Sequence, residues 1–219
     1  MKTIEELGIN GLKIIQDDSL YRFTSDSVLL SRFVTIKKND ILADFCSGSG
    51  IVGLHTYALN PCLKKVVLFE MQPAMAQMSK ESIELNNLQD IFSVENCKLQ
   101  EIDKRYNEYF SVIVCNPPYE KYDSGIKIEK EEIAVCKKEI TLTLPEIVKS
   151  AARCLKFGGR FALTHKAERL VDVFFEMRAN NIEPKKLSIV YGGNLPYLVM
   201  VEGVKGGKSG LTVTTTVKN

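Results

Sequence analysis

Four residues that follow an apolar run have the composition of a rigid binding corner. The run at 112–115, VIVC, ends in Asn116, Pro117, Pro118 and Tyr119. Neither proline has a backbone N–H, so a strand ladder cannot continue through them. The Asn116 side-chain oxygen and the Pro117 backbone carbonyl are acceptors that suit the two N–H bonds of an exocyclic amine. The Tyr119 ring offers a flat face on which an extruded base can stack.

This corner predicts methylation of an amine nitrogen. The lone pair of an adenine amine is delocalised into the ring, so the nitrogen is a poor nucleophile. Two acceptors bound to its N–H bonds draw the nitrogen toward tetrahedral geometry, and these bonds strengthen as positive charge develops in the transition state. No strong general base is needed, because the methylated cation sheds its proton readily. The alternative is a strand end followed by a polyproline turn that binds nothing.

A glycine-rich turn earlier in the chain has the spacing of a nucleoside site. The sequence DFCSGSGIVGL contains Gly48, Gly50 and Gly53 as G-x-G-x-x-G, between an expected strand and an expected helix. Glycines let the backbone approach a ligand closely, and a carboxylate at the end of the next strand, here Glu70, can accept hydrogen bonds from ribose hydroxyls. The same pattern occurs in nicotinamide dehydrogenases, so two kinds of ligand remain open.

Asp44 favours one of them. It stands four residues before Gly48, at the end of the strand that leads into the turn. A dinucleotide pyrophosphate is negative and favours a helix N-terminus without a nearby carboxylate. S-adenosylmethionine has a sulfonium, an ammonium and no phosphate, so a carboxylate suits it. We therefore expect S-adenosylmethionine as the small-molecule methyl donor, with a dinucleotide or a turn without ligand as the alternatives.

Alternating strands and helices are expected to position both motifs. The expected strands are 41–46, 65–70, 91–96, 112–115 and 160–164, and the expected helices are one from 51, 73–87, 144 to a stop at 158–159, and 167–181. KLSIV, the turn GGNLP and YLVMVE read as a closing antiparallel hairpin. The pattern predicts an α/β fold with a mostly parallel sheet and helices on both faces. Ligands then bind outside the carboxyl ends of the strands.

The length and composition fit one such domain. The 219 residues, 45% apolar and 26% charged, are enough to bury a full core. We divide the chain into an N-terminal segment (1–40), a methyltransferase domain (41–204) and a basic C-terminal tail (205–219). The first segment should hold a short extended stretch at 18–23 and a short helix at 25–34. Without a signal region or a run of roughly 18 apolar residues, we expect a cytoplasmic protein with no membrane contact.

Cysteine, histidine and net charge give only weak indications of partners. The six cysteines form no CxxC pair and the two histidines are far apart, so neither disulfides nor a metal site is expected. The net charge is only +2. The tail is basic, with Lys205, Lys208 and Lys218, and is either frayed and solvated or a phosphate contact. Basic and acidic residues are interleaved over 121–138, so charge adds little support for an RNA partner.

The motifs together resemble the class I S-adenosylmethionine-dependent N-methyltransferases, whose hallmark is (D/N/S)PP(Y/F). Within them the chain is similar to the bacterial tRNA adenine-N6 methyltransferases, which modify the adenine 3′ to the anticodon of a valine tRNA. The similarity covers nearly the whole chain and rests on GLKIIQDDSLYRFTSDSVLLSRFV, DFCSGSGIVGL, CNPPYEKYDSG, CKKEITLTLPEIVKSAARCLKFGGRF, HKAERLVDVF and VEGVKGGKSGL. It implies a Rossmann-like fold with a seven-stranded sheet, a tRNA substrate and S-adenosylhomocysteine as the product.

The resemblance also implies roles for individual residues. It places Gly48 and Gly50 under the methionine moiety of the donor, Asp44 near its ammonium, Glu70 on its ribose and Asp26 close to the donor pocket. It places 116–119 at the target amine, with Asn116 bordering the donor as well.

Two positions depart from the family pattern. The family has an acidic residue after the third strand that accepts from the adenine of the donor, and Lys98 stands there in this chain. We expect the backbone of Cys97, Lys98 and Leu99, or the Asn96 side chain, to make this contact instead. The GGNLP turn is also shorter and less basic than the corresponding loop of the relatives.

Four other functions remain as alternatives. Protein glutamine methyltransferases also use NPPY, but they carry a helical domain ahead of the catalytic one, for which the 40 residues before Ile41 leave little room. DNA adenine methyltransferases usually carry a target-reading domain, and no insertion of that size is visible. A nicotinamide-dependent oxidoreductase and a catalytically idle binding module complete the set.

Overall fold

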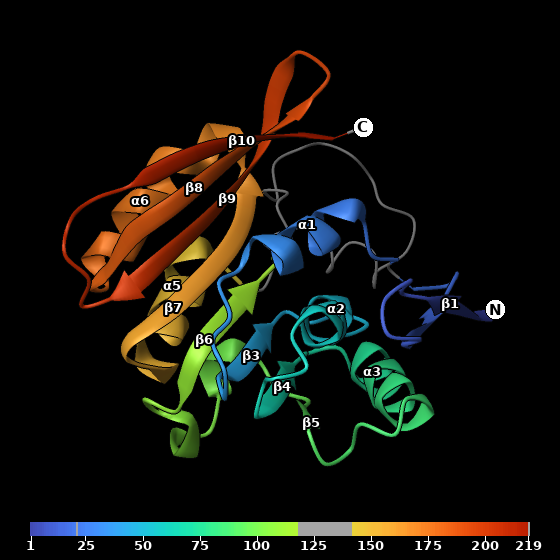
Figure 1. Ribbon diagram of the computed structural model, residues 1–219. Helices are drawn as coiled ribbons and strands as arrows, with labels where there is room; N and C mark the ends of the chain where they lie inside the picture. Colours follow the sequence, from blue (N-terminus) through green and yellow to red (C-terminus); the bar gives the residue numbers. More distant parts are fainter. Residues whose placement is uncertain (21, 118–141, 219) are drawn as a thin grey trace.

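The computed structural model of the protein describes residues 1–20, 22–117 and 142–218. Their largest unit is an eight-stranded sheet in the order β10-β8-β9-β7-β6-β3-β4-β5 (Figure 1). Its strands are β3 (Ile41–Phe45), β4 (Lys65–Phe69), β5 (Phe92–Glu95), β6 (Phe110–Cys115), β7 (Leu155–Lys166), β8 (Ile182–Gly192), β9 (Leu195–Lys205) and β10 (Thr212–Lys218). All neighbours are parallel except β9, which runs antiparallel to both β7 and β8. The predicted α/β fold with a mostly parallel sheet and a closing hairpin is confirmed.

Helices cover both faces of the sheet because successive strand residues point to opposite sides. On one face, α1 (Ser25–Phe33), α2 (Ile51–Leu59) and α3 (Pro73–Leu85) contribute to a core that includes Leu30, Leu54 and Ile83. On the other, α5 (Leu144–Cys154) and α6 (Leu170–Ala179) contribute Ile147 and Val173 to a second core. The short helical turns η1 (Leu99–Glu101), η2 (Lys104–Tyr106) and η3 (Ala167–Arg169) complete the connections. The sheet therefore has two buried faces, which explains the apolar runs of its central strands.

The first 40 residues contain more structure than the sequence predicted. The expected helix is confirmed as α1. Ahead of it, β1 (Lys2–Glu6) and β2 (Lys13–Asp17) form an antiparallel ribbon that packs on α3 through β2. The expected extended stretch at 18–23 is wrong, because Asp17–Leu20 closes a turn in which Ser19 donates its backbone N–H to the Asp17 carboxylate at 2.9 Å. An Asx turn of this kind satisfies the backbone without a strand partner.

The helix at 144 ends earlier than its glycine signal indicated. It stops at Cys154, and β7 begins at once with Leu155, a fully buried residue that pairs with Phe110. Gly158, at φ +75°, lies inside β7 where the pairing register shifts. The glycine pair therefore permits a bulge, and burial of Leu155 ends the helix.

One of the two expectations for the C-terminal tail is also wrong. The tail is not frayed, because β10 pairs in parallel with β8 over seven residues from Thr212 to Lys218. This strand raises the sheet from the expected seven strands to eight. Its residues are mostly β-branched, which suits a strand. In the described parts of the chain, no helix is long and apolar enough to span a bilayer.

Candidate active site

The two predicted motifs lie side by side at the carboxyl edge of the sheet. β3 and β6 are neighbours, and Phe45 pairs with Cys115, so the glycine turn after β3 and the Asn116 corner after β6 leave the sheet together (Figure 1). β4 lies on the other side of β3, and Phe45 pairs with Phe69, which places Glu70 at the same edge. Parallel strands thus bring residues 44–50, 70 and 116 to one place.

Hydrogen bonds hold the glycine turn in shape. Gly48, at φ +55°, donates its N–H to Glu70 Oε2 at 2.8 Å, and its carbonyl accepts from Ser79 Oγ at 2.9 Å. Glu70 Oε1 accepts from the Gln72 N–H at 2.8 Å. Burial raises the pKa of Glu70, while these backbone N–H groups oppose that shift. The Met71 backbone N–H also hydrogen-bonds this carboxylate. Contact of Glu70 with a ribose stays a prediction.

The later glycines of the motif serve packing. A Cβ on Gly50 would approach a Leu68 methyl at 2.8 Å, and one on Gly53 would approach Leu68 at 2.6 Å. Both contacts are closer than real Cβ atoms show, so a side chain at either position would require the buried Leu68 side chain to shift. The glycines of this motif therefore indicate close packing of α2 on β4 as well as room for a ligand to approach the backbone.

Asp44 is fully buried beneath the first turn of α2. Its Oδ2 accepts from the Gly53 N–H at 2.8 Å, while Oδ1 has no partner in the part of the chain that the structure describes. Burial raises the pKa of Asp44 to about 8, against the Gly53 hydrogen bond and with a contribution from nearby Glu70. A structural role for Asp44, supporting the start of α2, was missed from the sequence. Its proximity to a donor ammonium stays a prediction.

Asn116 is held at both ends of its side-chain amide. Its Nδ2 donates to Ser27 Oγ of α1 at 2.8 Å, and its Oδ1 accepts from Thr164 Oγ1 of β7 at 2.6 Å. Ser27 and Thr164 are 3% and 0% exposed, so both hydroxyls are fixed by their surroundings. The sequence analysis did not single out these two residues, which lie 89 and 48 positions from Asn116.

The rest of the proline corner is only partly described. Pro117 is buried at the end of β6. Pro118 and Tyr119 lie outside the described residues, so the predicted stacking face of Tyr119 is untested.

Asp26 ties the N-terminal segment to the hairpin. It lies in the first turn of α1, and Tyr197 of β9 donates its hydroxyl to Asp26 Oδ1 at 2.9 Å. Burial and this hydrogen bond raise the pKa of Tyr197. Since Ser27 follows directly, the contact also steadies the part of α1 that meets Asn116.

The segment after β5 offers mainly backbone to a ligand. Leu99 is buried in the core and its carbonyl accepts from Ser150 Oγ at 3.2 Å. Cys97 is half-buried, and the Lys98 side chain is 54% exposed with its Nζ 4.0 Å from Glu101. Asn96 Nδ2 donates to the Glu70 and Met71 carbonyls at 2.8 and 3.1 Å, which links this segment to the end of β4. Adenine contact through Cys97 or Lys98 backbone stays a prediction.

Cys46 is a site residue that the sequence reading passed over. It lies directly after β3 with φ +57°, a left-handed conformation that side chains rarely adopt. Its thiol meets the buried Cys115 thiol, and burial together with this contact raises the pKa of Cys115 well above its ordinary value. The two thiols therefore lie together at the carboxyl ends of β3 and β6, between the glycine turn and Asn116.

Known proteins share this arrangement. The methyltransferase small-domain family matches residues 24–183, which is well over half of the chain and contains both motifs. The chain belongs to this family. Its Rossmann-like sheet agrees with a solved structure described as a predicted O-methyltransferase from Agrobacterium tumefaciens. That structure has a TM-score of 0.67 at 18% identity and covers 87% of this chain and 86% of its own.

Two relatives have names that describe methyltransferases of RNA. One, from Shewanella baltica, is named tRNA1(Val) (adenine(37)-N6)-methyltransferase and is 23% identical over 141 residues, 64% of this chain and 58% of the relative. The other, from Alteromonas mediterranea, is named ribosomal RNA large subunit methyltransferase G and is 26% identical over 124 residues, 52% of this chain and 30% of the relative. The match thus spans less than two thirds of either relative.

Proposed function

We propose that this methyltransferase transfers a methyl group from S-adenosylmethionine to the N6 amine of an adenine in tRNA, beside the anticodon of a valine tRNA. The observation that carries the proposal is the placement of Asn116. Its amide stands at the carboxyl end of β6, next to the glycine turn after β3, and is oriented by hydroxyls from α1 and β7. An oriented amide acceptor beside a nucleoside turn suits amine methylation.

The residues around the glycine turn fit a cationic donor. The Asp44 Oδ1 atom is buried without a partner among the described residues, which leaves a negative charge or a proton unpaired there. A cation in the adjoining turn would favour the charged carboxylate and offset its burial. S-adenosylmethionine, when bound, supplies a methyl group made electrophilic by its sulfonium. Gly48 would lie under its methionine part, and Glu70 would accept from its ribose.

Asn116 would act on the acceptor nitrogen. The Thr164 hydroxyl donates to Asn116 Oδ1. An amide oxygen can accept two hydrogen bonds, and we propose that an N–H of the amine donates to Oδ1 in the reacting complex. With the Pro117 carbonyl as the other acceptor, both N–H bonds of the amine would be held. These hydrogen bonds gain strength as positive charge grows on nitrogen, so they lower the barrier more than they tighten ground-state binding.

The RNA substrate rests on the relatives' names and on the resemblance described above. The Shewanella relative supports adenine in a valine tRNA. The Alteromonas relative favours a second candidate substrate, ribosomal RNA.

A labelled-donor assay tests the proposal. The full chain is incubated with labelled S-adenosylmethionine and, separately, bulk tRNA and ribosomal RNA from a strain lacking this gene, and the nucleosides are analysed by mass spectrometry. N6-methyladenosine in the tRNA fraction, absent with Asn116→Ala, is the expected result. Label in ribosomal RNA alone supports the second candidate. Donor binding with no label in either RNA would overturn the RNA assignment, and label in glutamine of added protein would replace it.

A further inference from the structure

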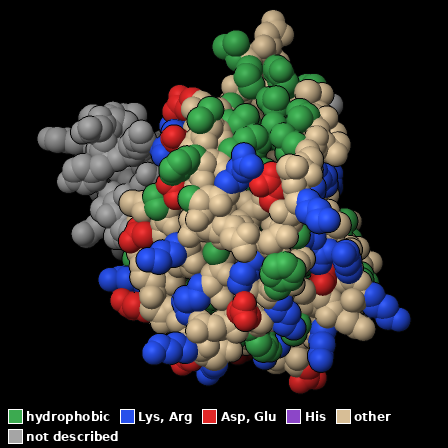
Figure 2. Space-filling view, turned by 90° about the vertical axis from the view of Figure 1, so that its left-hand side faces the viewer, with side chains coloured by type: hydrophobic (Ala, Val, Ile, Leu, Met, Phe, Trp, Pro, Cys, Tyr) green, Lys and Arg blue, Asp and Glu red, His purple; other side chains and the backbone are tan. Residues whose placement is uncertain are grey.

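The outer edge of β10 is open to another strand. β10 is the last strand of the sheet, and it pairs with β8 on its inner side, while no strand in the described parts of the chain pairs with its outer side. Val213 and Val217 are 54% and 65% exposed. The view onto this side of the molecule shows hydrophobic side chains gathered toward its top (Figure 2). Exposed edges of this kind template pairing with a further chain unless charge or proline blocks them.

The strand sequence reads almost the same in both directions. Around Thr215, the run Thr212–Lys218, TVTTTVK, has valine two residues away on each side and threonine one residue away on each side. A twofold axis at Thr215 would therefore set Val213 opposite Val217 of a second copy and Thr214 opposite Thr216. Like pairs of β-branched residues are favourable cross-strand neighbours. A self-complementary edge is what an isologous interface requires.

Charge favours the antiparallel register. Residues 212–217 carry no charge, and Lys218 is the one charged residue of the strand. Antiparallel pairing about Thr215 sets the two Lys218 residues at opposite ends of the new ribbon, opposite Thr212. A parallel pairing in register would place them next to each other, which costs free energy.

The apolar side of this ribbon lies on the α6 face. Val213 pairs with Leu187, and Leu187 belongs to the same core as Val173 of α6. Because strand residues alternate, Val213, Thr215 and Val217 all point to that face. On the opposite face of β10, the Thr216 hydroxyl already has a hydrogen-bond partner, because Thr216 Oγ1 and Ser188 Oγ are 2.9 Å apart.

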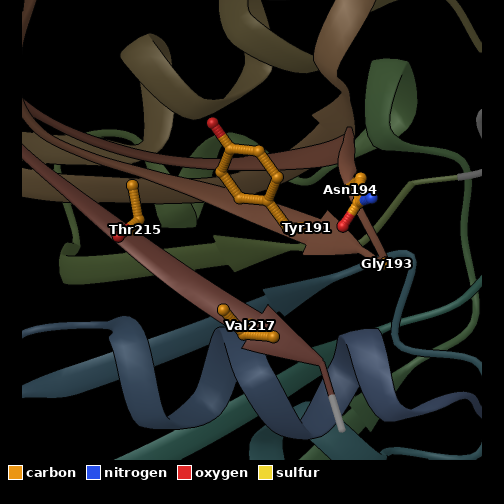
Figure 3. Close-up of a pocket in the computed structure, with 5 residues that line it drawn as sticks. All are labelled: Tyr191, Gly193, Asn194, Thr215 and Val217. Atoms are coloured by element: carbon orange, nitrogen blue, oxygen red, sulfur yellow. The ribbon is translucent and has the colours of Figure 1, made fainter.

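An open hollow adjoins the same side of the strand. Its volume is about 530 Å³, and it is lined by Tyr191, Gly193, Asn194, Thr215 and Val217 (Figure 3). In the twofold pairing, Val213 of the second copy would lie beside Val217 at this hollow. The Tyr191 ring then gains an apolar neighbour, and Val213 and Val217 of both copies leave water.

We propose that β10 pairs antiparallel with β10 of a second copy of this chain, about a twofold axis at Thr215, and joins the two sheets. The proposal does not depend on the proposed function, because β3 and β6, which carry the candidate active site, lie inside the sheet away from this edge. Each copy keeps its own site.

Light scattering after gel filtration tests the association. The full chain is expected to elute with the mass of two chains, falling to one on dilution. Val213→Asp with Val217→Asp places four carboxylates along the ribbon and should give a monomer. Val171→Asp is the control, since Val171 of α6 is a valine that is even more exposed, at 78%, and the dimer should persist. A monomeric wild type, or a dimer unaffected by the β10 change, would overturn the proposal.

Disulfide trapping tests the register without destabilising the fold. Thr215→Cys alone should cross-link to itself under mild oxidation, because residue 215 faces its own copy. Val213→Cys should cross-link when mixed with Val217→Cys and far less by itself. Wild-type protein oxidised in parallel measures the background from native cysteines. Self-cross-linking of Val213→Cys without that of Thr215→Cys would exclude the stated twofold axis.

Discussion

Asn116 depends on its neighbours for its orientation. A free asparagine amide rotates between rotamers, whereas this one meets buried hydroxyls at both ends, Ser27 on one side and Thr164 on the other. Acceptors that are already aimed at the reacting nitrogen need no reorganisation during the reaction. The contribution to catalysis that we propose for Asn116 therefore depends on Ser27 and Thr164 as well, and the three residues come from three separate elements.

Replacing Asn116 with alanine should reduce kcat for methyl transfer by at least ~100-fold, because a hydrogen-bond partner of the transition state is removed. Donor affinity, measured by calorimetry, should stay within a few-fold of wild type. Wild-type turnover by this variant would show that another group holds the amine.

Thr164→Val removes the hydroxyl that meets Asn116 Oδ1 and keeps the side-chain shape. We expect kcat to fall about 10-fold, because small misplacement of an acceptor is costly, while donor affinity is unchanged. Thr164→Ser keeps the hydroxyl and should restore most of kcat. If valine and serine variants lose stability and activity to the same extent, the hydroxyl has no positioning role.

Asp44 should make stability depend on pH in an unusual direction. Burial raises its pKa to about 8 in the folded state, above the ordinary value near 3.8, so the folded protein binds more protons than the unfolded one between these values. The stabilisation from Asp44 is thus full below about pH 4 and is lost as pH rises toward 8, by at most about 1.4 kcal/mol per pH unit.

Asp44→Asn lacks this titration and can keep the contact with Gly53 through its amide oxygen. The unfolding free energy of the asparagine variant minus that of wild type, from urea titrations, should therefore increase from pH 5 to pH 8. A difference that is flat with pH would show that Asp44 is ionised throughout.

At the scale of elements, one buried ion pair fastens the connection between α1 and β3. Asp40, just before β3, pairs with Arg160 of β7, and both side chains are 8% exposed. Asp40 Oδ2 also accepts from the Lys37 N–H at 2.6 Å. Glu202 of β9 adds a second tie, accepting from the Thr35 N–H at 2.6 Å. These contacts hold the connection between α1 and β3 against β7 and β9. They therefore help to position α1 and its residue Ser27.

Asp40→Ala should lower the free energy of unfolding by about 3–5 kcal/mol, because it leaves the Arg160 guanidinium buried without its counter-charge. Replacing both residues with leucine should recover most of that loss, since no charge is then buried. Urea unfolding of the three proteins measures both effects. A single variant as stable as wild type would mean that water reaches Arg160.

At the scale of the whole molecule, donor binding should stabilise the fold. The glycine turn, Glu70 and Asn116 come from separate strands that a bound ligand would link. At a donor concentration about 100-fold above Kd, mass action adds about 2.7 kcal/mol, or a rise in Tm of roughly 5–10 °C for a domain of this size.

NAD+ provides the matched comparison in the same thermal melts. It should leave Tm unchanged, because the Asp44 carboxyl beneath the first turn of α2 disfavours a negatively charged pyrophosphate there. Stabilisation by NAD+ and not by S-adenosylmethionine would favour the oxidoreductase alternative.

Much of the sheet could be predicted from local patterns. The strands at 41–45, 65–69 and 110–115 are apolar runs bounded by glycine, proline or polar residues, and the helices between them begin and end at recognisable residues. The motif residues 44–50, 70 and 116 were brought to one edge because parallel strands share their carboxyl ends. β10 and the β1–β2 ribbon were missed, since short β-branched runs have little periodicity of their own.

The sequence by itself determined the order of strands and helices from α1 to β9, the glycine turn, the proline corner and the family. Only the tertiary structure decided which side chains meet across the sheet: Ser27 and Thr164 on Asn116, Tyr197 on Asp26 at a separation of 171 residues, and the outer position of β10. Local signals arise from residues a few positions apart. Contacts of this range depend on strand order and on which face each residue points to, and these are set by burial of the whole chain at once.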